Sequence, residues 1–265
     1  MKEINENKKA WSMLSKDHYE HYKKRLSDHK IHINENIINE LGDIKGKSLL
    51  HLQCNTGADT ISLARLGLDQ AVGVDLSESN VYYANELAKD FKMNHVSFIE
   101  SDVLKLDEIH HEKYDIVFTS EGVLGWLPDL KKWAKVVRSM MKDYGYFYVY
   151  DSHPFFHLFD EDLLSLGETK LKYDYFNVKA DEADEIGGYA SDVKYAKNFW
   201  WNHSFSDIIN ALIEAGLEIN YLHEFDTLFW QNGNMDEVKP YLFKYKHFNN
   251  QLPLSYSIKA TVKRK

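Results

Sequence analysis

Apolar positions along the chain follow two alternating periods from residue 46 onward. Short apolar runs have the length and composition of buried strands, and a segment of helical period follows the first, the second and the fourth of them. These runs lie at 48–52, 71–76, 96–100, 114–120 and 144–152. Such alternation predicts parallel strands joined by right-handed helical crossovers. Residues 217–226 and 254–263 are two more predicted strands with no helical pattern between them, so we expect them to pair antiparallel.

This order predicts an α/β fold: a doubly wound sheet of seven strands, mostly parallel with an antiparallel last strand, and helices on both faces. Residues 1–45 read as an N-terminal helical cap. Residues 46–154 and 202–265 form the predicted Rossmann-like domain. The alternation of predicted strands and helices stops after Pro154, and residues 155–201 contain a predicted hairpin around Gly187–Gly188. We expect this insertion to be a substrate lid over the carboxyl edge of the sheet; a decorative surface hairpin is the alternative.

Composition and charge limit the partners of the chain. The net charge of -9 argues against nucleic acid, and no apolar run is long enough to span a membrane. A single cysteine, Cys54, fits a reducing cytoplasm. Thirteen histidines, among them His18 and His21, show no metal-binding spacing, so we expect solvated histidines and no metal. The aromatic content of 14% fits either an aromatic-lined pocket or an ordinary core.

The residues that follow each strand are candidates for ligand binding, because open α/β sheets bind ligands at the carboxyl ends of their strands. The first such loop, "QCNTG" (53–57), has one glycine, Gly57, which allows a close approach of helix and strand. Asn55 tolerates left-handed backbone and can replace a second glycine. Gln53 offers amide donors and an acceptor.

The next three strand ends add polar groups suited to a nucleoside. Asp75, followed by Leu76, stands where a carboxylate can grip both hydroxyls of a ribose. Asp102 can accept from an exocyclic amine, and the backbone N–H of Val103 can reach an adenine ring. The fourth strand leads into a glycine-containing loop that carries polar and aromatic candidates. They are Ser120, Glu121 and Trp126.

Together these motifs resemble class I S-adenosylmethionine-dependent methyltransferases. "LLHLQCNTG", "GVDLS", "ESDVLKL" and "YDIVFTS" are similar to four motifs of that family, and the resemblance covers residues 46–152 and 204–263. Further phrases resemble a bacterial subgroup whose substrates are mostly unassigned. The resemblance implies S-adenosylmethionine as cofactor. The residues it assigns to the cofactor are Gln53, Asn55, Gly57, Asp75, Leu76, Asp102, Val103 and Ser120.

The first motif departs from the family pattern. His51 stands at the usual acidic position, and Gln53 and Asn55 replace glycines. Asp59 is a candidate substitute that would hold the ammonium group of the cofactor, although an acidic residue at a helix start also suits the helix dipole alone. The bulkier loop crowds the space that a pyrophosphate would need, which favours S-adenosylmethionine over a dinucleotide.

The predicted reaction is methyl transfer to a small, partly apolar or aromatic metabolite. His153 and Glu121 are the candidate bases, with His153 preferred, and Tyr22, Trp126 and His203 are candidate substrate contacts. Trp11 and Tyr19 on the first helix are further candidates to cover the donor. A catalytically silent cofactor-binding protein and a protein-interaction scaffold are the alternatives. The oligomeric state is left open.

Overall fold

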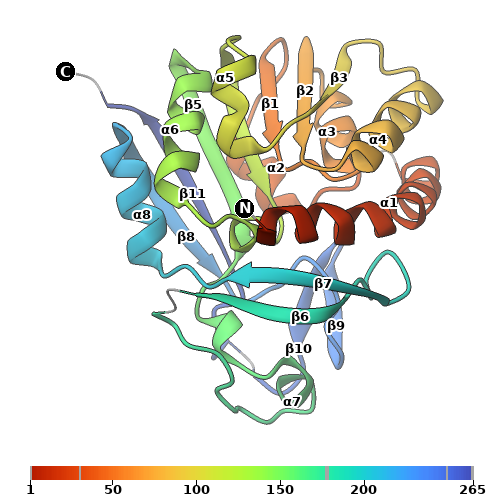
Figure 1. The fold of residues 1–265 in the computed structure, drawn as a ribbon, viewed down its shortest axis with the longest axis vertical. Coiled ribbons are helices and arrows are strands. Elements are labelled where there is room, and N and C mark those ends of the chain that lie inside the picture. The colour runs from red at the N-terminus through yellow and green to blue at the C-terminus, as the bar shows by residue number, and fades with distance from the viewer. Residues whose placement is uncertain (1, 30, 177–178, 249, 264–265) are drawn as a thin grey trace.

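The computed structural model describes residues 2–29, 31–176, 179–248 and 250–263 and contains a central seven-stranded sheet (Figure 1). Its strand order is β3-β2-β1-β4-β5-β11-β8, and β11 runs antiparallel to both of its neighbours. The sheet strands are β1 (Ser48–Leu52), β2 (Gln70–Asp75), β3 (Val96–Glu100), β4 (Tyr114–Ser120), β5 (Met141–Ser152), β8 (Leu217–Phe225) and β11 (Ser255–Val262). The predicted seven-stranded fold is confirmed.

Helices cover both faces of the sheet. One face packs against α5 (Leu106–Ile109), α6 (Leu130–Met140) and α8 (Phe205–Glu214). The other packs against α2 (Glu35–Leu41), α3 (Ala58–Ala64) and α4 (Glu78–Asp90). Alternate residues of β4 separate these cores: Val117 points to the first, whereas Ile116 and Phe118 point to the second.

Other segments gather at the carboxyl edge of the sheet. α1 (Lys2–Asp28) runs across this edge beside the hairpin of β6 (Ala180–Ile186) and β7 (Lys194–Trp201) (Figure 1). A third apolar cluster joins α7 (Glu161–Ser165) to a second hairpin, β9 (Met235–Lys239) and β10 (Leu242–Tyr245). Ser152 at the end of β5 lies opposite Ser255 at the start of β11, so both insertions leave the sheet at the same edge.

Several local predictions are confirmed and others are corrected. Ser204 and Asp207 have the sequence spacing of a capping box variant and form a capping box at the start of α8, and the expected hairpin contains Gly187 and Gly188 at positive φ. Pro128 is a residue type that favours the first position of a helix, but α6 begins after it: Asp129 caps α6 by accepting a hydrogen bond from the N–H of Lys132. In the described part of the chain, no helix has the length and apolarity needed to cross a membrane.

Candidate active site

A cavity of about 770 Å³ lies at the carboxyl edge, between the strand ends and the covering segments. Most of the residues proposed from sequence line this cavity. They are Tyr22, Gln53, Asn55, Asp75, Leu76, Asp102, Val103, Ser120, Glu121 and Trp126. Gly57, His153 and His203 are not among the lining residues. The carboxyl ends of β1 to β4 thus meet at one site, as expected for a parallel sheet.

The loop after β1 has the backbone conformation of a glycine-rich loop although its sequence contains one glycine. Gln53 and Asn55 are both left-handed, with φ of 59° and 51°, so both do what glycine does elsewhere. Asn55 donates its backbone N–H to Asp75 Oδ2 at 2.8 Å, and its Oδ1 accepts from the N–H of Thr56. Gln53 donates its Nε2 to the carbonyl of Val123 at 2.9 Å. Side-chain hydrogen bonds therefore hold a loop that non-glycine residues rarely form.

Gly57 supports the loop from outside the cavity. Its φ is +79°, and a Cβ there would lie 2.5 Å from the ring of Phe98. We therefore expect Gly57→Ala to lower the free energy of unfolding by about 2–4 kcal/mol, because it adds both backbone strain and overlap. Urea denaturation measures this change. Gly216→Ala is the control: Gly216 follows the end of α8 with a φ of +87° and open space around it, so it reports backbone strain without the overlap.

His51 stands at the position where the family carries an acidic residue, and hydrogen bonds through Ser120 connect it to Asp59. Its Nδ1 lies 2.8 Å from Thr60 Oγ1 and its Nε2 lies 3.2 Å from Ser120 Oγ, which donates to Asp59 Oδ2 at 3.0 Å. Burial lowers the pKa of His51 to about 3, so the ring is neutral. Burial raises the pKa of Asp59 to about 6, against a smaller opposing effect of the Ser120 hydrogen bond. The chain of hydrogen bonds fixes the Asp59 carboxylate at the cavity wall.

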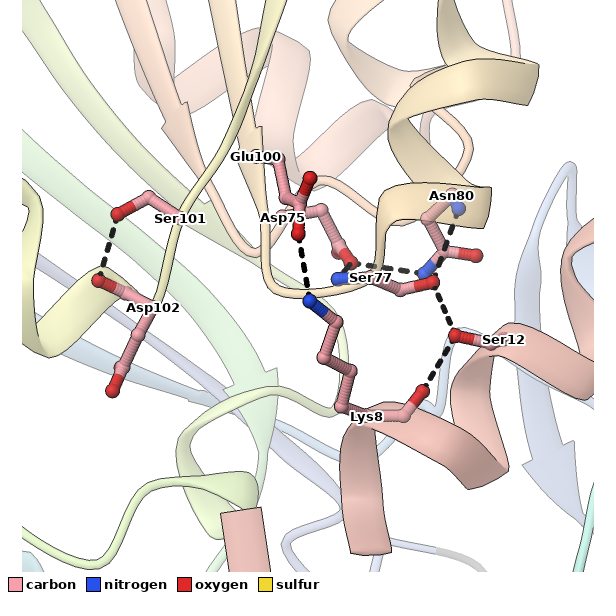
Figure 2. Close-up of polar contacts among 8 residues, drawn as sticks. All are labelled: Lys8, Ser12, Asp75, Ser77, Asn80, Glu100, Ser101 and Asp102. Carbon is pink, nitrogen blue, oxygen red and sulfur yellow. Dashed lines mark hydrogen bonds and ion pairs between the residues drawn. The ribbon is translucent and has the colours of Figure 1, made fainter. Parts of the chain in front are cut away.

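Hydrogen bonds from neighbouring residues take up most of the acceptor capacity of the Asp75 carboxylate. Besides Asn55, the N–H of Ser77 and Nδ2 of Asn80 donate to its Oδ1 at 2.9 and 3.0 Å (Figure 2). A carboxylate accepts about four hydrogen bonds, and the backbone N–H of Leu76 also acts on this one, so at most about one more can form, fewer than the two that our ribose prediction assumed. Burial raises the pKa of Asp75 to about 6.

Helix α1 is tied down beside Asp75. Ser12 Oγ lies 2.8 Å from Ser77 Oγ, and Lys8 Nζ pairs with Glu100 at 2.6 Å (Figure 2). On the other side of the helix, the Asn7 side chain bonds both the N–H and the carbonyl of Phe199 in β7. These contacts join α1 to the sheet edge and to the β6–β7 hairpin.

The residues after β3 keep groups available to a ligand. Asp102 caps the short turn η1 (Val103–Lys105) by accepting from the N–H of Leu104 at 3.0 Å. Val103 is the first residue of this turn, so its N–H has no acceptor within it. Asp102 and Val103 both line the cavity.

Glu121 is the first residue after β4 and has a left-handed conformation, with φ of 60°. Its Oε1 accepts from Asn34 Nδ2 at 2.8 Å. Burial raises the pKa of Glu121 well above its usual value, and the nearby Asp59 raises it further. The following loop is held by Asp151, which accepts from the N–H groups of Gly122 and Leu124 at 2.6 and 3.0 Å.

Three histidines differ from the sequence interpretation. His153 is buried outside the cavity lining: its Nδ1 accepts from the N–H of Phe155, so Nε2 carries the proton that bonds Glu224 at 2.8 Å. Neither nitrogen is then available as a base, and we do not retain His153 in that role. His203 Nε2 lies 2.8 Å from the carbonyl of Leu127, and His203 itself is not among the residues that line the cavity. His18, expected to be solvated, is fully buried and contacts Asn55.

The cavity also contains residues that sequence reasoning did not select. His157 Nε2 lies 2.6 Å from Ser152 Oγ, and burial lowers the pKa of His157 to about 4. Tyr189 comes from the turn between β6 and β7. The aromatic segment "NFWWNH" (198–203) contributes Trp200. Within the described residues, no group of three or more His, Cys, Asp or Glu is placed to hold a metal ion.

Comparison with known proteins agrees with this geometry. A family model for the methyltransferase domain matches residues 43–200. An uncharacterized protein of Haemophilus influenzae is 25% identical over 227 residues, which cover 80% of this chain and 85% of that protein.

Two solved structures have a similar fold. An S-adenosylmethionine-dependent methyltransferase from Clostridium acetobutylicum has a TM-score of 0.55 at 14% identity, covering 94% of this chain and 92% of its own. One from Mesorhizobium loti has a TM-score of 0.55 at 15% identity, covering 84% and 94%. The chain therefore belongs to the methyltransferase domain family, and its fold is similar to that of S-adenosylmethionine-dependent methyltransferases.

Proposed function

We propose that this methyltransferase delivers the methyl group of S-adenosylmethionine to a small, partly apolar or aromatic molecule. The observation that carries the proposal is the continuity of the cavity. The cofactor residues predicted at the ends of β1, β2 and β3 line one part of it, and aromatic residues of both insertions line another. Donor and acceptor can therefore meet in one enclosed space, which is the main requirement of an in-line displacement.

The residues present fit the cofactor in chemical type. Asp75 would accept from a ribose hydroxyl, Asp102 from the exocyclic amine of adenine, and the Val103 N–H would donate to the adenine ring. Asp59, fixed by Ser120, would hold the ammonium group. Thr56 lines the cavity and is fully buried, and its hydroxyl has no partner among the described residues, so a polar ligand would satisfy it. When bound, S-adenosylmethionine supplies an electrophilic methyl group.

Residues 155–201 serve in this proposal as the substrate lid and residues 1–45 as the cap. The support is the double hydrogen bond of Asn7 with Phe199, which makes α1 and β7 one cover over the sheet edge. Glu121, which lines the cavity and has a raised pKa, is the remaining candidate base.

Isothermal calorimetry with S-adenosylmethionine and S-adenosylhomocysteine tests the function. We expect both to bind with one site per chain, and we expect methyl release onto a member of a metabolite panel. If neither compound binds, both the methyltransferase and the silent cofactor-binding protein are contradicted, and a protein-interaction scaffold is favoured. Binding without transfer to any panel member would favour a silent binding protein.

A further inference from the structure

The cavity wall has a strong excess of negative charge. Among the described residues that line it, eight are Asp or Glu and two are Lys or Arg. Both cations are engaged: Lys8 pairs with Glu100, and Arg25 lies 4.6 Å from the ring centre of Tyr241. An anionic acceptor, such as a carboxylate or a phosphate, would be repelled by such a wall, whereas a cation would be attracted.

Part of this charge lies beyond the residues assigned to the cofactor. Once Asp59, Asp75 and Asp102 are given to the cofactor, Glu121 and Glu161 remain as partly buried carboxylates of the cavity lining. Glu121 accepts from Asn34 and Glu161 from Asn232, and among the described residues no Lys or Arg forms an ion pair with either. Burial of a carboxylate without a counter-ion is unfavourable, so a cationic ligand at this place would be stabilised.

A second observation also points to a cation. Gln53 uses its Nε2 on Val123, which leaves its Oε1 buried and without a partner. Trp11 and Trp200 each lie 5.1 Å from Trp126 between ring centres, in edge contacts, and we call these three side chains the aromatic wall. Trp126 is fixed by its own hydrogen bond to the carbonyl of Gly122, the residue after Glu121. An unpaired acceptor, indole rings and the Glu121 carboxylate, all lining one cavity, are groups that recognise an N–H-bearing cation.

We propose that the methyl acceptor is an amine with an apolar or aromatic body, bound as its ammonium ion between Glu121 and the aromatic wall, and that its nitrogen is the atom methylated. This inference rests on the proposed function and specifies its substrate class.

The proton balance follows from Glu121. The ammonium ion gives one proton to the Glu121 carboxylate, which frees the nitrogen lone pair. That lone pair forms the N–C bond while the C–S bond breaks and its electron pair passes to sulfur, so the positive charge of the sulfonium ends on the methylated nitrogen. A carboxylate whose pKa is raised by burial is suited to accept this proton.

Three probes of one shape and different charge test the inference: phenethylamine, 2-phenylethanol and 3-phenylpropanoate. Calorimetry is done on the full chain saturated with S-adenosylhomocysteine. We expect the amine to bind at least about tenfold more tightly than the alcohol, and the carboxylate to bind most weakly. Glu121→Gln, which can still accept from Asn34, is expected to reduce the amine preference to below about threefold.

The matched control is Glu214→Gln, which removes the same charge outside the cavity lining. Glu214 is the last residue of α8, and its carboxylate pairs with Lys131 of α6. It is expected to keep the wild-type preference. The inference is overturned if the alcohol or carboxylate binds as tightly as the amine, if no amine binds, or if Glu121→Gln retains the preference. In those outcomes S-adenosylhomocysteine still binds; its failure to bind would instead overturn the proposed function, and the amine proposal with it.

Discussion

Replacement of Asp75 by alanine is expected to weaken S-adenosylmethionine binding by about 10- to 150-fold, since a hydrogen bond to a charged group contributes about 1.5–3 kcal/mol. The carboxylate would lose its bond to the ribose. The N–H groups of Asn55 and Ser77 would also lose their acceptor, so the loop that surrounds the methionine end would shift. Calorimetry measures the affinity, and thermal unfolding measures the accompanying loss of stability.

Asp115→Ala separates these two effects. Asp115 also accepts three hydrogen bonds, two from Ser48 and one from Lys142, but it lies at the opposite edge of the sheet, near the start of β4. We expect it to lose stability while keeping cofactor affinity within about threefold of wild type. Equal affinity losses in both variants would mean that Asp75 acts only through folding, and unchanged binding in Asp75→Ala would place the ribose elsewhere.

The sheet could be predicted from sequence because buried parallel strands are short apolar runs between turn residues. β1, β3 and β4 have the predicted limits, 48–52, 96–100 and 114–120. The β9–β10 hairpin was not predicted: "MDEVK" alternates too weakly, and the stability of this hairpin comes from distant contacts with residues such as Phe156 and Leu164.

Half of the site could be predicted for a similar reason. Asp75 and Asp102 follow directly from the topology, because the carboxyl ends of parallel strands meet. The other half depends on side-chain direction and on contacts between distant segments. His153 immediately follows β5, yet its hydrogen bonds with Phe155 and Glu224 hold it outside the cavity lining, whereas His157 reaches the cavity. No periodicity in the sequence encodes which of the two turns inward.

Asp59→Asn should make the ligand-free protein more stable and its cofactor binding weaker. The folded-state pKa of Asp59 is about 6, above its ordinary value of 3.8, so the folded chain holds this proton more tightly than the unfolded chain does. The ionised carboxylate therefore costs nothing below pH 3.8, costs progressively more as the pH rises toward 6, and has its full cost above 6. Asparagine removes this cost and can still accept from Ser120.

We expect the variant to gain about 1–3 kcal/mol in free energy of unfolding near pH ~8, and to lose that advantage near pH ~4. Urea denaturation across this range measures the gain, and Asp69→Asn, at an exposed carboxylate, should show none. S-adenosylmethionine affinity should fall by at least about tenfold near pH ~8, because the ammonium group loses its counter-ion. A variant that loses stability at every pH and binds the cofactor normally would show that Asp59 serves only as the partner of Ser120. A carboxylate that serves to bind a cationic ligand is buried favourably only when that ligand is present. Its replacement by an amide should therefore raise the free energy of unfolding and lower the cofactor affinity together.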